Sequence, residues 1–79
     1  MRIDKFLKVS RLIKRRTIAN EACDAGRISV NGRVIKASYS VETGDVIEIR
    51  FGERTLKVEV LSVSEHATKS GASAMFMEL

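Results

Sequence analysis

The sequence predicts an α+β fold, in which a small helical corner of two short helices packs on a small, mostly antiparallel sheet. The first observation is the helical spacing of apolar residues in the first 25 positions. The second is a change, from Ile28 onward, to short apolar segments separated by glycine-containing turns. The third is the length of 79 residues, which favours one domain, 1–79, with little room for a deep catalytic cavity.

The first helix is predicted around residues 3–7. Ile3, Phe6 and Leu7 follow the i, i+3, i+4 spacing of a helix that buries one face. Ser10–Lys14 is expected to turn the chain.

A second helix is predicted over Ile18–Ala25, with Thr17 as its N-cap. Gly26 can adopt the left-handed conformation that commonly ends a helix. The buried stripe of this helix is expected to contain Ile18, Ala19, Ala22 and Cys23.

Strands are expected after Ile28. The Asn31-Gly32 pair is a strong signal for a tight turn between two strands. Thr43–Asp45 marks another turn, and Val46–Phe51 is predicted as a half-buried strand whose Phe51 is buried. Gly52–Arg54 is expected to form a hairpin loop.

The C-terminal part gives weaker signals. A long strand is predicted over Leu56–Val63, with a bulge near Val60-Leu61. His66–Ser73 is expected to be a flexible loop, and Ala74–Leu79 a last edge strand. The region 62–79 therefore has the weakest pattern of the chain.

The charge of the chain is unevenly distributed. Residues 1–36 contain ten basic and three acidic residues, whereas residues 37–79 contain four basic and seven acidic ones. Such asymmetry favours an oriented contact with a polyanion such as a nucleic acid. The alternative is a basic face that is merely solvated.

The sequence offers no recognisable catalytic or metal-binding motif. His66 is the only histidine and Cys23 the only cysteine, so a structural zinc site is excluded and no cofactor or metal is expected. Cys23 is predicted to be a buried small thiol. No apolar run reaches the roughly 18 residues of a membrane span, and we expect a cytoplasmic protein without a secretory signal.

The candidate binding site is the basic corner formed by the two helices and the turn between them. Seven basic residues fall within Arg2–Thr17, and the start of the second helix could share a phosphate with the arginines before it. Because Phe6 and Phe51 are expected to be buried, recognition should depend on RNA shape and backbone more than on base stacking. The predicted basic contacts are Arg2, Lys5, Lys8, Arg11, Lys14, Arg15, Arg16 and Arg27.

Several segments of the chain form one recurring pattern, within a core motif of about residues 2–51. The segments are Arg2–Leu7, Arg11, Lys14–Thr17, Ala25–Gly32 and Thr43–Ile47. In this order and spacing they resemble the S4 RNA-binding domain, named after the fourth protein of the small ribosomal subunit.

The resemblance implies the alpha-L RNA-binding motif. The whole chain is also similar to two related bacterial families, one of ribosome-associated quality control and one of fifteen-kilodalton heat-shock proteins. The first implies a monomer that binds 23S rRNA and peptidyl-tRNA on split, stalled large subunits, together with a tailing factor, and supports alanine tailing of the nascent chain.

The RNA-facing positions implied by the resemblance are Arg2, Asp4 and Arg16. Asp4 cannot attract a phosphate, so it either orients Arg15 or Arg16 by a charge-assisted hydrogen bond or only caps its helix. The alternative function is a structural or interaction module whose basic face binds an acidic protein. An enzymatic function is the least favoured interpretation, because the sequence has no recognisable catalytic motif.

Overall fold

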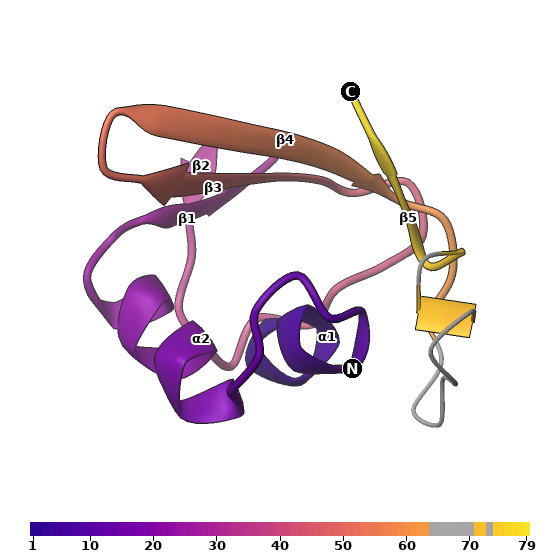
Figure 1. Cartoon of the computed structure of the whole chain (residues 1–79), viewed down its shortest axis with the longest axis horizontal. Helices are drawn as coiled ribbons and strands as arrows, with labels where there is room; N and C mark the ends of the chain where they lie inside the picture. Colours follow the sequence, from indigo (N-terminus) through magenta and orange to yellow (C-terminus); the bar gives the residue numbers. More distant parts are fainter. Residues whose placement is uncertain (64–70, 73) are drawn as a thin grey trace.

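The computed structural model describes residues 1–63, 71, 72 and 74–79 of the chain. Two helices lie side by side against one face of a five-stranded antiparallel sheet (Figure 1). Across the sheet the strands follow the order β2 (Arg33–Val34), β1 (Ile28–Val30), β3 (Val46–Phe51), β4 (Arg54–Val60) and β5 (Phe76–Glu78). The predicted α+β architecture is therefore confirmed. The opposite face of the sheet carries no helix in the described part of the chain.

The first helix, α1 (Ile3–Val9), buries the predicted apolar residues Ile3, Phe6 and Leu7 completely. The start of α1 is hydrogen-bonded to the connection between β2 and β3: the amide of Ile3 donates to the carbonyl of Tyr39 at 2.7 Å. The turn expected after this helix is also present.

The second helix, α2 (Arg16–Asp24), begins two residues earlier than predicted. Its N-cap is Arg15, so the assignment of Thr17 as N-cap is wrong. The earlier start puts Arg16 and Asn20 one helical turn apart on the same face, and both side chains reach a carboxylate on α1. These tertiary contacts outweigh the local preference of Thr17 for a cap position.

The end of α2 agrees with the prediction. Gly26 has a φ of +75°, and its amide donates to the carbonyl of Cys23 at 3.0 Å. The amide of Arg27 donates to the carbonyl of Ala22, also at 3.0 Å. These two bonds define a Schellman motif, in which a left-handed residue ends the helix and redirects the chain.

The turns predicted at Asn31-Gly32 and Thr43–Asp45 are present, whereas the hairpin loop predicted over Gly52–Arg54 is shorter, because Arg54 already pairs with Phe51 as the first residue of β4. Asn31 and Gly32 both have positive φ, 52° and 84°, as the tight turn between β1 and β2 requires. The strand predicted over Val46–Phe51 is present with those bounds, and the last strand lies at the edge of the sheet.

Some expectations for the strands are corrected. The strand predicted to reach Val63 ends at Val60 without a bulge, because the amides of Leu61 and Ser62 both turn to the carbonyl of Met75. Phe51, predicted to be buried, is 49% exposed at the end of β3, beside the hairpin.

Two further expectations concern Ile18 and the predicted loop. Ile18 is 49% exposed, because it lies on a flank of α2 rather than on the face that meets the sheet. His66 and most of the loop predicted over His66–Ser73 lie outside the described residues. Of the two described positions in that loop, Ala72 is buried.

The core lies between the two helices and the covered face of the sheet. Cys23 is buried in it, as predicted, and burial, together with the nearby carboxylates of Asp4 and Asp24, raises the pKa of its thiol to about 11. The central core side chains are Ile3, Phe6, Leu7, Ala19, Cys23, Ile28, Val30, Ile47, Ile49, Val58 and Val60.

Candidate nucleic-acid interface

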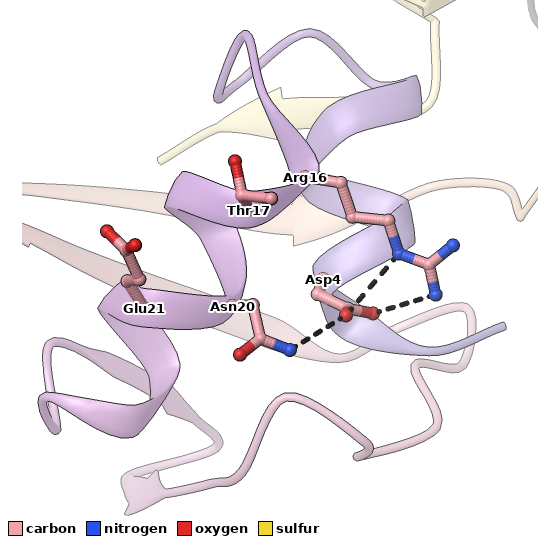
Figure 2. A pocket seen from close by; sticks show the side chains of 5 residues that line it. All are labelled: Asp4, Arg16, Thr17, Asn20 and Glu21. Atoms are coloured by element: carbon pink, nitrogen blue, oxygen red, sulfur yellow. Dashed lines mark hydrogen bonds and ion pairs between the residues drawn. The ribbon is translucent and has the colours of Figure 1, made fainter.

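A buried carboxylate lies at the centre of the helical corner. Asp4, in the first turn of α1, has a side chain that is only 3% exposed. Its oxygens accept hydrogen bonds from the Lys5 amide at 2.8 Å and from the Asn20 amide group at 3.3 Å. They also pair with the guanidinium groups of Arg2 and Arg16 at 3.3–3.4 Å (Figure 2 shows Arg16 and Asn20).

These donors determine the protonation state of Asp4. Burial on its own would raise the pKa of the carboxyl group, because it disfavours the charged form. The hydrogen bonds from Asn20, Arg16 and the Lys5 amide, with the positive charge of Arg16, outweigh burial and lower the pKa below its usual value. Asp4 is therefore ionised at neutral pH.

The two arginines that pair with Asp4 remain accessible. The side chains of Arg2 and Arg16 are 50% and 47% exposed. Each guanidinium has five N–H donors, and each uses two nitrogens on Asp4. Because the carboxylate fixes one edge of each group, the remaining donors point in restricted directions and can donate to a phosphate without much loss of side-chain freedom.

The two alternatives for Asp4 can now be compared. Its carboxylate contacts Arg16 and not Arg15. It also contacts Arg2, a pairing that was not predicted from the sequence. Its one hydrogen bond to the backbone goes to the neighbouring Lys5 amide, whereas the N-cap of α1 is Arg2. The geometry is that of a residue that orients arginines and incidentally satisfies one amide of the first turn.

An open pocket of about 360 Å³ lies between the two helices. Thr17 and Glu21 extend it along α2 (Figure 2). The first hydrogen bond within α2 joins the Ala19 amide to the Arg15 carbonyl, so the amides before Ala19 lie at the open, positive end of the helix. The positive end of the helix and the Arg16 guanidinium both favour an anionic group near the start of α2.

The other predicted contacts are spread over the surface. Lys5 is half-buried, and Arg11 adopts a left-handed conformation, φ 66°, in the turn between the helices. Arg2, Asp4 and Arg16 are the predicted residues that converge. Exposed side chains without an ion pair to any described residue belong to Lys8, Arg11, Lys14, Arg15 and Arg27.

Sequence reasoning missed Asn20. Its amide group donates to Asp4 from one turn beyond Arg16 on the same face of α2. The four-residue spacing of Arg16 and Asn20 was a usable signal, because residues four apart on a helix are neighbours.

Within residues 1–63, 71, 72 and 74–79, no three His, Cys, Asp or Glu side chains are grouped so that they could bind a metal ion. Over the same residues, none of the helices has the length and apolar composition needed to span a lipid bilayer.

The fold and this corner define an RNA-binding domain of the S4 class. Residues 1–47 match the family described as the S4 domain, which covers the helical corner, β1, β2 and the start of β3. The resemblance inferred from the sequence motifs is thus confirmed.

Full-length relatives identify the family more narrowly. The chain is 55% identical over 76 residues to the RQC P-site tRNA stabilizing factor of Halalkalibacterium halodurans, covering 96% of this chain and 86% of the relative. It is 51% identical over 76 residues to the protein of the same name from Bacillus subtilis, covering 96% and 88%. The chain belongs to the family of RQC P-site tRNA stabilizing factors.

A solved structure supports the fold. Heat shock protein 15 of Vibrio cholerae, described as trimeric, superimposes with a TM-score of 0.91 at 29% sequence identity. The match covers 100% of this chain and 81% of that protein. The similarity to the heat-shock family, also predicted, is confirmed.

Proposed function

We propose that this protein binds the large ribosomal subunit and stabilises a peptidyl-tRNA in the P site of split, stalled ribosomes, while alanine residues are added to the nascent chain. Its helical corner contacts both 23S rRNA and the tRNA. In this proposal the protein works in the cytoplasm as a monomer, without a cofactor or catalytic residue, beside a tailing factor on the same particle. The name of its relatives, P-site tRNA stabilizing factor, supports the tRNA contact.

The observation that carries the proposal is the pairing of a buried carboxylate with two half-exposed arginines. The carboxylate holds one edge of each guanidinium group, and the other donors stay open to solvent, where a phosphate can reach them. Restricting Arg2 and Arg16 before binding lowers the entropic cost of contact, about 0.5–1.5 kcal/mol for each ordered side chain.

The remaining basic side chains supply charge around this centre. They contact phosphates without specifying their position, since an exposed lysine or arginine with no fixed partner has no preferred geometry. In the proposal these residues are Lys8, Arg11, Lys14, Arg15 and Arg27, and the half-buried Lys5 adds a further positive charge next to Asp4.

The test replaces Arg16 by alanine and measures affinity for large subunits that carry tRNA. We expect about tenfold weaker binding, because one charge-assisted contact is lost, and an unfolding free energy lowered by less than about 1 kcal/mol, because Arg2, Asn20 and the Lys5 amide still satisfy Asp4. Arg16→Lys should recover binding only in part, since lysine cannot pair bidentately.

Arg33→Ala is the matched control, because it removes one exposed positive charge from β2, away from the corner. Equal effects of the two variants would mean that net charge alone determines binding. RNase treatment should abolish co-sedimentation with the particle; retained co-sedimentation would favour an acidic protein as the partner.

A further inference from the structure

A second pocket lies on the other flank of α2. Ala19 and Cys23 of this helix face the core, and Arg16 and Asn20 face Asp4. Ile18 lies on the remaining flank, where a pocket of about 290 Å³ opens between α2, the turn after α1 and the end of β3. The helix thus separates the Asp4 pocket from a second concave site.

The walls of this second pocket are apolar and accessible. Ile18 and Phe51 line it, and each is 49% exposed. Leu12 adds a partly buried wall, while the buried side chains of Ile13 and Ile49 connect the pocket to the core. An exposed aromatic ring at the rim of an apolar pocket can stack on a base, whereas the prediction of a buried Phe51 had left few residues for stacking.

The border of the pocket is basic. Lys14, Arg27 and Arg50 line it, and all three are exposed. None of them forms an ion pair with a described residue, and the described lining contains no acidic side chain. An apolar peptide would match the apolar walls but not the three cations at the border. A nucleotide matches both, because its base is largely apolar and its phosphates are negatively charged.

We propose that this pocket receives one unstacked nucleotide of the bound RNA, whose base packs against Phe51 and whose phosphates lie near Lys14 and Arg27. The proposal rests on the proposed function, because it needs RNA at the helical corner. The volume, at the lower limit of the 300–1,000 Å³ typical of small-molecule sites, suits a group as small as one base.

The two sites can act on one RNA strand. An α-helix with its side chains is about 10–12 Å across, so a strand that crosses the start of α2 passes from one flank to the other within a few nucleotides. Its backbone would meet Arg16 on one flank and its base would enter the pocket on the other. This arrangement favours a loop or a flipped nucleotide over a continuous duplex, since paired bases cannot leave the stack.

The test compares Phe51→Leu and Lys14→Gln with the wild-type chain in binding to large subunits that carry tRNA. Phe51→Leu keeps apolar volume but removes the aromatic face, so we expect about three- to tenfold weaker binding with an unchanged dependence on salt. Lys14→Gln should weaken binding and reduce the log–log salt slope by about 1. Arg33→Gln is the control for charge outside the pocket.

A second measurement locates the contact directly. A single-stranded tetranucleotide is titrated into the isotopically labelled full chain, and amide shifts should concentrate around Lys14, Ile18 and Phe51. Shifts that miss these residues, or wild-type affinity of Phe51→Leu at an unchanged melting temperature, would overturn the pocket assignment. A Phe51→Leu variant that binds RNA normally but no longer binds a protein partner would also overturn the pocket assignment.

Arg16→Ala, measured in parallel, separates the two proposals. If Arg16→Ala weakens binding and Phe51→Leu does not, RNA binding at the corner stands and the nucleotide pocket is wrong. If neither substitution weakens binding, the proposed function is wrong and the pocket assignment fails with it.

Discussion

Replacing Asp4 by asparagine tests whether the carboxylate organises the arginines. The substitution keeps the size of the side chain and one acceptor oxygen for the Lys5 amide. It removes the charge that pairs with Arg2 and Arg16 and puts an NH2 group among donors. It also makes the basic surface more positive, which by itself should strengthen RNA binding.

The magnitude follows from the contacts. Hydrogen bonds to a charged group contribute about 1.5–3 kcal/mol, and the half-exposed arginines place the loss near the lower part of that range, about 2 kcal/mol. For a domain of this size, about 2 kcal/mol lowers the melting temperature by roughly 8–16 °C. Without the carboxylate, Arg2 and Arg16 must both be ordered when RNA binds, which costs about 1–3 kcal/mol of binding free energy. We expect about tenfold weaker binding after the gain in positive charge is included.

The assay is affinity for large subunits carrying tRNA, at one salt concentration and well below the melting temperature of the variant. Glu21→Gln is the matched control: Glu21 lines the same pocket, is exposed and forms no ion pair with a described residue, so its neutralisation should slightly strengthen binding. Tighter binding by folded Asp4→Asn would refute the orienting role. Strictly additive effects of Asp4→Asn and Arg16→Ala would also contradict it, because residues that act as a unit are non-additive.

Three further results are expected. Binding should weaken with salt at a log–log slope of about −3 to −5, if four to six phosphates are neutralised; a flat titration would contradict the electrostatic account. Because folding lowers the pKa of Asp4, its stabilisation is complete above the unfolded-state value of about 4 and is lost as pH falls through the folded-state pKa, so wild type and Asp4→Asn should approach equal stability in acid melts. Cys23, with a thiol pKa of about 11, should resist alkylation at pH 8 until the chain unfolds.

Local patterns in the sequence predicted most of the fold. The spacing of Ile3, Phe6 and Leu7 predicts α1, and Gly26 and Asn31-Gly32 predict turns, because each signal is contained in a few neighbouring residues. The end of β4 could not be predicted in this way. It depends on the carbonyl of Met75, which comes from a distant part of the chain.

In the candidate site too, local patterns were predictable from the sequence, whereas contacts between the two helices were not. The sequence and its family resemblance pointed to Arg2, Asp4 and Arg16, but which arginine Asp4 contacts depends on how α1 and α2 pack. The exposure of Ile18 was also unpredictable, since helical spacing places an apolar residue on a stripe without showing where the covering surface ends. The pocket between Ile18 and Phe51 therefore could not be predicted from the spacing of apolar residues.

The cluster of Arg2, Asp4 and Arg16 carries two positive charges and one negative charge, and each arginine pairs directly with the carboxylate. One additional monoanion makes it neutral, and a second would be repelled by the first and by Asp4. In the proposed function, the cluster would therefore distinguish a single phosphate in one position from a dense array of phosphates, which a run of lysines would bind without selection. On a particle covered with RNA backbone, this matching of charges would let a very small protein bind in one position instead of wherever negative charge is highest.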